Sequence, residues 1–318
     1  MFAGFVMTFR QMGETKMIRN LLFAGVLLAA AAPALAQPAP GPSPYATLPD
    51  HPTCTRAELQ ATTDAYVEAQ KRGDISGLPL AANAHYLENM ATVERGQGLW
   101  ATRLPVANAI SFHDPKRCKT FTQMIVTEGG HPYVIGTRLY LNDGKIIRVD
   151  SLVTDKGDWL FNANAYLKYS TKEDWGDVPA GQRTAPSEMM RGADAYLSSF
   201  NDKFTEVPWG TPCARLEGGA YTNRKGDPNA SCNVGIPPGV LYIVNRDYLI
   251  DEDKGVINIF CRFGDSKSGM PDAHTFRYVG GKIHAVHTLS VNLGSNPSPQ
   301  ADDDGGMIRP PTAAAATR

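Results

Sequence analysis

The chain has 318 residues, and its 31 Lys and Arg residues nearly balance 32 Asp and Glu residues, which gives a formal net charge of −1. No cluster of Lys and Arg forms a basic stripe, so the electrostatic footprint needed to bind phosphate backbones is missing. We therefore predict that nucleic acid is not a partner.

The N-terminal region has the layout of an export signal. A short basic start at residues 17–20 precedes an apolar run at 21–32 and a small-residue cleavage site at 34–36. The apolar run is shorter than the ~20 residues that a membrane-spanning helix needs. We predict that residues 1–36 are upstream residues and a signal peptide, and that residues 37–52 are a flexible N-terminal segment. The expected location is periplasmic or secreted, with no membrane attachment after signal cleavage.

An oxidising compartment favours disulfides among the five cysteines. Cys213 and Cys232 enclose a segment rich in Gly, Asn and Pro, so their pairing would staple one long loop. Cys54, just ahead of the first predicted helix, can reach Cys118, which leaves Cys261 buried and free. We favour these two bridges, although five cysteines allow other connectivities and the sequence does not choose among them. No pair has the close spacing of a zinc ribbon, so we predict no structural zinc.

An internal repeat predicts two related domains. The tripeptide Asp64-Ala65-Tyr66 recurs at 194–196, and Leu87-Glu88 recurs at 216–217, about 130 residues later in each case. A linker containing Pro and Gly separates the copies, and the C-terminal tail is rich in Pro, Asp and Ala. The predicted boundaries are 53–178 for the first domain, 179–186 for the linker, 187–292 for the second domain and 293–318 for a disordered tail.

Each copy is predicted to begin with a helix and to end with a β-hairpin. Apolar residues at helical spacing, with Thr53 or Thr55 as the N-cap and Gly73 as the stop, predict a helix over residues 56–72. Ser187 is the expected cap of the second copy's helix. Two hairpins are predicted, with strands at 133–141 and 145–154 around Asn142-Asp143-Gly144, and at 276–279 and 283–291 around Gly280-Gly281. The fold class is α+β, with helices on one face of a curved antiparallel sheet.

Several strings carry a resemblance to known families. The run from Ala65 to Ile75, followed by 86–89 and 98–100, resembles the SnoaL-like, nuclear transport factor 2-like superfamily. The strings KGDWLF at 156–161 and PWGTPCARLEGGAY at 208–221, with 271–274, make the chain similar to an uncharacterised secreted family of fungi and bacteria. The resemblance implies two tandem cone-shaped domains, each a curved sheet packed with helices around a cavity for small apolar molecules.

The same resemblance implies roles in the first copy. Ketosteroid isomerases of this superfamily use a tyrosine on the first helix and a carboxylate on an early strand. Tyr66 fits the tyrosine, and the carboxylate position falls at Glu88 or Asn89, depending on a one-residue register choice. An asparagine cannot act as a base, so the first domain is a scaffold if Asn89 faces the cavity.

The second copy concentrates titratable residues. Counting outward from a two-residue turn pairs His274 with His287 on one face of the hairpin, with Asp272 two residues along on the same face. Arg215 and Glu217 on the early strand would complete a ring in one cavity. The alternative is a surface histidine pair beside a structural Arg215–Glu217 ion pair.

These residues lead to a functional prediction. We predict an exported, cofactor-independent lyase or isomerase that moves protons on a small apolar or aromatic molecule in the second-domain cavity. His274 or Glu217 is the predicted base, His287 the acid, Asp272 the residue that orients a histidine, and Arg215 the group that holds an oxyanion.

Three further expectations concern ligands and partners. Trp209 either lines the pocket or packs the core. Two histidines and a carboxylate also suit a metal, but we predict neither a metal nor a nucleotide cofactor. The alternative function is a non-catalytic small-molecule-binding or interaction module of the cell envelope, and the two domains can pack on each other.

Overall fold

The computed structural model describes residues 54–94, 96–233, 242–294 and 298–308. The chain divides into two compact units, residues 1–41 and 42–318, and every described residue belongs to the second unit. The predicted signal peptide and the segment 37–52 lie outside the described residues. No helix in the described part is long and apolar enough to cross a membrane.

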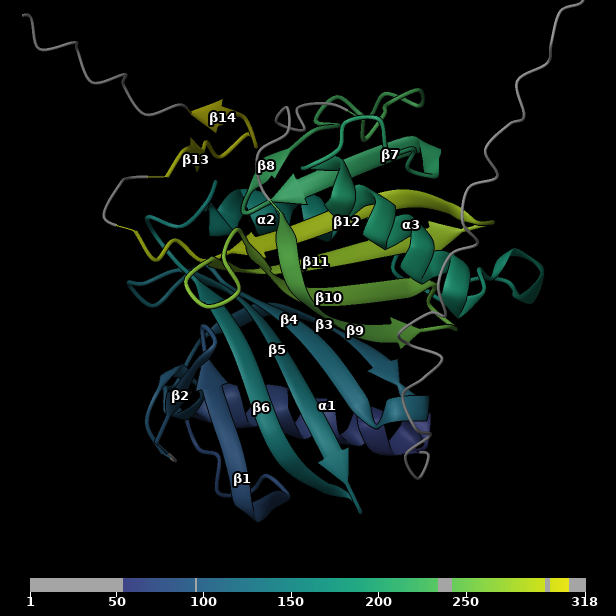
Figure 1. The fold of residues 1–318 in the computed structure, drawn as a ribbon. Helices are drawn as coiled ribbons and strands as arrows, with labels where there is room; N and C mark the ends of the chain where they lie inside the picture. Colours follow the sequence, from purple (N-terminus) through teal and green to yellow (C-terminus); the bar gives the residue numbers. More distant parts are fainter. Residues whose placement is uncertain (1–53, 95, 234–241, 295–297, 309–318) are drawn as a thin grey trace, which may run out of the picture. The chain divides into compact units, whose positions relative to one another are not determined.

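Two six-stranded sheets and a few helices form an α+β fold (Figure 1). The first repeat, residues 56–154, contains α1 (Arg56–Arg72), β1 (Leu80–Glu88), β2 (Ala91–Val93), β3 (Val106–Asp114), β4 (Lys119–Val126), β5 (Tyr133–Asn142) and β6 (Lys145–Thr154). The second repeat, residues 186–290, contains α3 (Pro186–Ser199), β7 (Trp209–Glu217), β8 (Ala220–Tyr221), β9 (Ile243–Asp251), β10 (Val256–Phe263), β11 (Met270–Val279) and β12 (Lys282–Ser290). Helix α2 (Ala163–Ser170) lies between them in the sequence, and β13 (Gln300–Ala301) and β14 (Met307–Ile308) follow. Short 3-10 helices occupy Leu99–Ala101, Pro115–Arg117 and Ala180–Gln182.

The helix predicted over residues 56–72 is confirmed. Thr55 caps it, and the side chains of Thr55 and Glu58 form a capping box that satisfies backbone N–H groups at the helix start. Gly73 ends the helix with φ of 68°, and a Cβ there would lie 2.4 Å from the backbone nitrogen of Arg103. Only glycine fits this left-handed position, because a side chain would collide with the backbone of the adjacent segment.

The two sheets have the same strand order. It runs β2-β1-β6-β5-β4-β3 in the first repeat and β8-β7-β12-β11-β10-β9 in the second. Both predicted hairpins form, because Asp143 and Gly144 adopt positive φ in one turn and Gly280 and Gly281 do so in the other. Most neighbouring strands are antiparallel, as predicted for the curved sheets, but each sheet also contains one parallel pair, β1 with β6 and β7 with β12.

Each of these hairpins carries a bulge that the sequence did not reveal. The pairing of β11 with β12 shifts between Arg277 and Tyr278, which leaves His284 as the extra residue on β12. The equivalent shift in the first repeat lies between Tyr140 and Leu141. Because side chains alternate along a strand, one extra residue moves every later side chain to the opposite face.

The two faces of each sheet have different partners. One face of the first sheet packs on α1, in a core that includes Leu59 and Tyr66, and one face of the second packs on α3, in a core that includes Tyr196. The other faces meet in a shared hydrophobic layer, which we call the inter-sheet layer. In it, the rings of Phe121 on β4 and Phe260 on β10 lie 6.0 Å apart in an edge-to-face contact.

Reciprocal contacts relate the two repeats by an approximate twofold axis. The backbone N–H of Ile250 donates to the Asp114 carboxylate at 3.1 Å, and the N–H of His113 donates to the Asp251 carboxylate at 2.9 Å. Asp114 and Asp251 are the last residues of β3 and β9, so each repeat offers the same group to the other. Such exchange is typical of an isologous dimer interface.

Two local predictions were wrong. Ser187 is not a cap, since α3 begins at Pro186, whose fixed φ suits the first helical position, and Ala185 precedes it without a side-chain cap. Residues 298–308 of the predicted disordered tail are ordered. They form the β13–β14 pair, which the side chains of Asn162 and Tyr169 hold through backbone carbonyls. The tail has few apolar residues, and these hydrogen bonds from the α2 segment stabilise it instead.

Candidate functional site

A buried polar cluster lies on the α3 side of the second sheet. Asp272 pairs across the sheet with Cys261 of β10 and Ser290 of β12, and His274 lies two residues along β11. The Nδ1 atom of His274 is 2.5 Å from an Asp272 carboxylate oxygen, at an angle poor for a hydrogen bond. The Ser290 hydroxyl donates to the other carboxylate oxygen, and the Cys261 sulfur lies 3.7 Å from the first. The carboxylate therefore holds one edge of the imidazole.

The rest of the His274 ring lies among aromatic side chains. The ring centroids of Tyr196, Phe263 and Phe276 are 5.4, 5.9 and 5.9 Å away. Among the described residues, the Nε2 atom of His274 has no hydrogen-bond partner. This edge can exchange a proton with a bound molecule, in surroundings that contain little water.

An ion pair continues the site toward β7. A guanidinium nitrogen of Arg215 lies 3.1 Å from a Glu217 carboxylate oxygen and donates to the Tyr196 hydroxyl at 3.4 Å. Burial opposes the charge on Arg215, but the Glu217 carboxylate and the Tyr196 hydroxyl outweigh it, so the pKa of Arg215 is raised. Burial also raises the pKa of Tyr196, which keeps its hydroxyl protonated. Trp209, which is partly buried, packs edge-to-face on Tyr196 with ring centroids 5.5 Å apart.

The structure does not bring His287 to this site. The bulge at His284 pairs His274 with Thr288 and His287 with Thr275, so the two histidines lie on opposite faces of the sheet. His287 instead belongs to the inter-sheet side, where its Nε2 atom contacts the Glu173 carboxylate. The predicted five-residue ring therefore reduces to Asp272, His274, Arg215 and Glu217.

In the first repeat, Tyr66 belongs to a hydrogen-bond chain. Its hydroxyl lies 2.9 Å from the Thr137 hydroxyl, which lies 2.8 Å from the hydroxyl of Ser151. Burial raises the pKa of Tyr66 to about 12. These contacts satisfy the tyrosine within the protein.

Glu88 and Asn89, the two candidates for the carboxylate position, have different contacts. Glu88 is the last residue of β1, and its carboxylate accepts hydrogen bonds from the Tyr86 hydroxyl at 2.6 Å and the Leu99 backbone N–H at 2.7 Å. Asn89 lies in the following turn and bonds to the backbone of Val153. The Glu88 carboxylate therefore braces the loop at Leu99.

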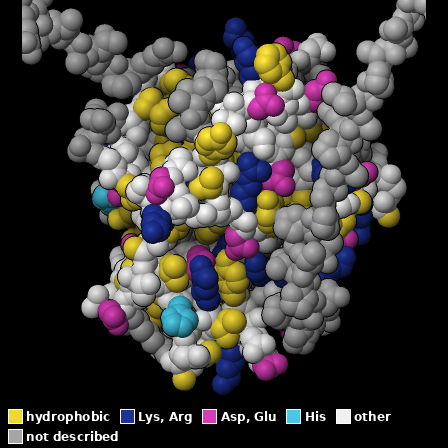
Figure 2. Space-filling model, in the orientation of Figure 1, with side chains coloured by type: hydrophobic (Ala, Val, Ile, Leu, Met, Phe, Trp, Pro, Cys, Tyr) yellow, Lys and Arg dark blue, Asp and Glu magenta, His cyan; other side chains and the backbone are white. Residues whose placement is uncertain are grey.

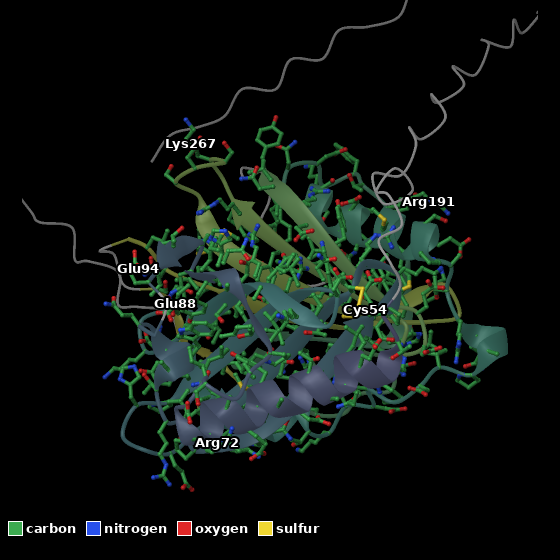
Figure 3. The ribbon with its side chains drawn as sticks, turned by 90° about the horizontal axis from the view of Figure 1, so that it is seen from below. Cys54, Arg72, Glu88, Glu94, Arg191 and Lys267 are labelled. Carbon is green, nitrogen blue, oxygen red and sulfur yellow. A yellow bond between two sulfur atoms is a disulfide. The ribbon has the colours of Figure 1, made fainter. Side chains whose placement is uncertain are left out.

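The favoured disulfides are confirmed. Cys54 bonds to Cys118 and Cys213 to Cys232, and Cys261 is free and buried. Figure 3 shows the yellow disulfide bond beside Cys54 at one end of α1, with Arg72 labelled at the other. Burial raises the pKa of the Cys261 thiol well above its ordinary value, so this sulfur is a neutral thiol.

The first repeat provides an internal control for the polar cluster. The row Cys261–Asp272–Ser290 occupies the same sheet positions as Met124–Ile135–Val153. These first-repeat residues are buried and apolar, and Thr137 stands at the position of His274. The fold therefore packs this region without titratable groups, so the cluster in the second repeat is not required by the architecture.

The cluster also contains a possible metal-binding set. The ligand atoms of Cys261, Asp272 and His274 lie within 4.8 Å of one another, and thiolate, carboxylate and imidazole all suit zinc. In this structure the Asp272 carboxylate is instead occupied by Ser290 and His274, and the thiol is neutral. In this arrangement the three groups contact one another or Ser290.

Two residues of the site were missed in the sequence. Tyr196 could have been found, because it repeats Tyr66 in the Asp-Ala-Tyr string. Ser290 carried no signal, since only the bulged register places it opposite Asp272.

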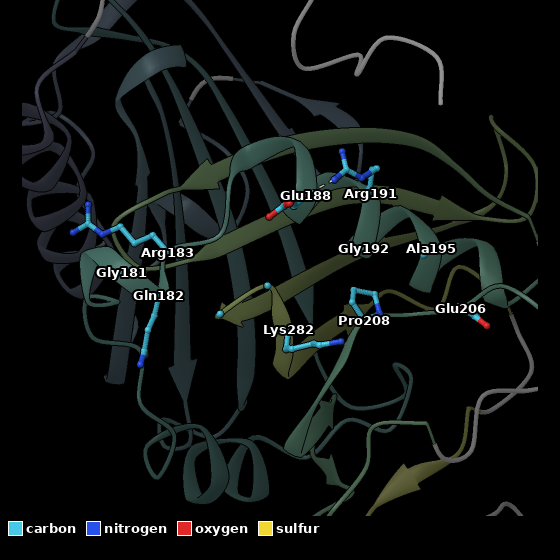
Figure 4. Close-up of a pocket in the computed structure, with 12 residues that line it drawn as sticks. Gly181, Gln182, Arg183, Glu188, Arg191, Gly192, Ala195, Glu206, Pro208 and Lys282 are labelled. Atoms are coloured by element: carbon cyan, nitrogen blue, oxygen red, sulfur yellow. Dashed lines mark ion pairs between the residues drawn. The ribbon is translucent and has the colours of Figure 1, made fainter. Parts of the chain in front are cut away.

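One surface pocket of the second repeat is lined by residues outside this cluster. It has a volume of about 700 Å³ and lies beside α3 and the β11–β12 turn, where exposed Glu188, Arg191 and Lys282 contribute to its lining (Figure 4). Neither Asp272 nor His274 lines this pocket. Figure 2 shows basic, acidic and hydrophobic side chains interspersed over one face of the molecule.

Comparisons with known proteins give no activity. Residues 182–290 match a family model described as "Domain of unknown function (DUF8021)". None of the curated proteins matches the chain. An NTF-2 like protein of unknown function from Burkholderia xenovorans LB400 is a structural neighbour at 15% identity and a TM-score of 0.26, covering 31% of this chain and 84% of its own. "AclR a putative hydroxylase" from Streptomyces galilaeus is another, at 16% identity and a TM-score of 0.25, covering 31% of this chain and 91% of its own.

Proposed function

We propose that the protein is an exported, cofactor-independent enzyme, a lyase or isomerase, that performs acid–base chemistry on a small apolar molecule in the second repeat. The observation that carries this proposal is the replacement of Met124, Ile135 and Val153 of the first repeat by a buried cluster around Asp272 and His274. Burying polar groups costs free energy, so a cluster that the fold does not need points to a function. Two disulfides are compatible with export.

His274 is the proposed base. Its free Nε2 atom takes a proton from a substrate carbon, while the Asp272 carboxylate orients the ring and balances the imidazolium charge. The Tyr196 hydroxyl accepts a hydrogen bond from Arg215, so its own proton can point at the substrate. Together the guanidinium and the hydroxyl stabilise the negative charge that develops on a carbonyl oxygen.

The proton on His274 then completes the reaction. It returns to another carbon in an isomerisation, or leaves with a hydroxyl group as water in an elimination. Glu217 acts through Arg215, since its carboxylate pairs with the guanidinium at 3.1 Å. The aromatic rings around His274 favour an apolar or aromatic substrate. Entry would pass Trp209 and Phe263, which are only partly buried.

The experiment compares the mature protein, from Gln37 onward, with His274→Thr, which introduces the residue of the first repeat. Both are incubated with pooled aromatic, terpenoid and sugar-derived compounds, and mass spectrometry records products while thermal shift records binding. We expect His274→Thr to bind a compound without converting it. His131→Thr, at an exposed histidine of the first repeat, is the matched control and should retain turnover.

Equal turnover by the wild type and His274→Thr would refute the catalytic role. Binding without turnover in the wild type would favour the second candidate, a non-catalytic small-molecule-binding module of the cell envelope.

A further inference from the structure

A second, more enclosed recess lies between the two sheets, outside the polar cluster. It has a volume of about 210 Å³. Both repeats contribute to its lining. Its apolar wall includes Met90, Leu152 and Phe260, and its polar end includes Arg148, Asp150 and Asp247. We call it the inter-sheet recess.

The approximate twofold axis gives this recess a counterpart. The row Phe121–Arg138–Asp150 of the first sheet matches the row Asn258–Thr275–His287 of the second. By the same register, Gln123 is the counterpart of Phe260, and Leu289 is the counterpart of Leu152. The counterpart therefore lies around His287.

The counterpart is filled by the protein's own aromatic rings. The ring centroids of Trp175 and Tyr166 lie 4.7 and 5.5 Å from that of His287, and the Tyr166 hydroxyl donates to the Gln123 side chain at 2.8 Å. Both rings come from α2 and the segment after it, which connects the repeats and occurs once in the chain. One of two equivalent positions thus holds aromatic rings with a hydrogen-bonding group, and the other is open.

Two residues that line the open recess have a positive φ. Met90 and Asn245, which line it, adopt φ of 65° and 56°. The turn that holds Asn89 and Met90 corresponds to Gly218-Gly219 in the second repeat, where glycine adopts positive φ without steric cost. A methionine in this conformation is disfavoured by roughly 1–2 kcal/mol. Its side chain packs against the inter-sheet layer, which indicates that the wall it provides is kept in spite of the strain.

The polar end defines the chemistry of the ligand. Arg148 binds both oxygens of Asp150, at 2.7 and 2.6 Å, and Asp247 accepts hydrogen bonds from Arg138 and the Tyr140 hydroxyl. Asp247 also pairs with Lys119 at 3.0 Å, so both carboxylates already have basic partners and a cationic ligand is not required. A neutral hydroxyl can still donate to a carboxylate oxygen. A dry cavity of about 150 Å³ accepts benzene, so this volume suits one substituted ring.

We propose that the inter-sheet recess binds a neutral, single-ring aromatic molecule with a hydroxyl group, of the phenol class. The ring packs against Met90, Leu152 and Phe260, in the place that Trp175 and Tyr166 fill at the counterpart. The hydroxyl hydrogen-bonds to the Asp150 or Asp247 carboxylate. This site is separate from the one around His274, which lies on the other face of the second sheet.

The test is calorimetric titration of the mature protein with phenol and with toluene. We expect saturable binding of phenol and at least about tenfold weaker binding of toluene, which lacks the hydroxyl. Leu152→Trp should fill the recess and weaken phenol binding by about tenfold or more. Ile147→Trp, at an exposed residue of the same strand, is the control and should bind as the wild type does.

A second variant keeps the test independent of folding defects in the buried layer. Met90→Gly relieves the positive φ, so the fold should be at least as stable, while phenol binding should weaken because one wall is lost. Absence of saturable phenol binding, or binding unchanged in both Leu152→Trp and Met90→Gly, would overturn the proposal. His274→Thr should leave phenol binding unchanged, which distinguishes this site from the proposed catalytic one.

Discussion

His113 should make the stability of the first repeat depend on pH. Its side chain is 1% exposed in the α1 core, where its Nε2 atom lies 3.2 Å from the Thr63 hydroxyl. Burial lowers its pKa from 6.5 to about 4, and the Asp251 carboxylate compensates only in part. The perturbation is His113→Gln, which keeps a polar group near Thr63 but cannot titrate.

The sign follows from proton linkage. Between pH 6.5 and 4 the unfolded chain binds a proton at His113 that the folded protein does not, so the free energy of unfolding falls as the pH falls. With these two pKa values the loss between pH 7.5 and pH 5 is about 2 kcal/mol, and it approaches about 3 kcal/mol below pH 4. His113→Gln should remove this contribution.

The assay is urea unfolding at pH 7.5 and pH 5, followed by far-ultraviolet circular dichroism. The drop in unfolding free energy between the two pH values should be about 2 kcal/mol smaller in His113→Gln than in the wild type. His85→Gln, at an exposed histidine of β1, is the matched control and should retain the drop of the wild type. Equal drops in the wild type and His113→Gln would refute the reasoning that burial depresses this pKa.

Two further predictions concern covalent and ionic contacts. Replacing Cys54 and Cys118 by Ala opens a loop of 64 residues, and the chain-entropy relation gives a loss of about 4 kcal/mol, measurable by urea unfolding. A loss below about 1 kcal/mol would contradict that account. Asp247→Asn removes a charge partner of Arg138 and should cost roughly 1–2 kcal/mol, because the Asp247 side chain is 43% exposed and Arg138 keeps its hydrogen bonds to Asn258. Adding Arg138→Met to that variant should recover part of the loss, and no recovery would contradict the ion-pair explanation.

The local structure of the repeats could be predicted where it depends on local chemistry. Helix α1 has a cap at Thr55 and a stop at Gly73, and the Asn142-Asp143-Gly144 turn needs residues that tolerate positive φ. Those signals act over a few residues and leave a mark in the sequence. The parallel pairing of β1 with β6 joins strands far apart in the chain, and no local pattern encodes it.

The residues of the candidate site on β11 could be predicted from the sequence, but those on β12 beyond the bulge could not. Asp272 and His274 share a face because they lie two residues apart on β11, which alternation alone ensures. His287 was placed wrongly because the inserted residue His284 is invisible to counting from a tight turn. The same shift brings Ser290 opposite Asp272. The single inserted residue His284 therefore removes His287, the predicted acid, from the site. It also places the Ser290 hydroxyl beside the Asp272 carboxylate.

The joining of the two repeats in one chain explains why their recesses differ. An isologous pair of separate, identical chains would present two equal recesses, either both open or both filled. Here the chain must run from the end of β6 to the start of α3, and that connection carries Tyr166 and Trp175 into the inter-sheet layer on one side only. No second connection exists in the described residues to fill the recess beside Met90. The fusion itself therefore breaks the symmetry, which leaves one recess to a structural role and makes the other available to a ligand.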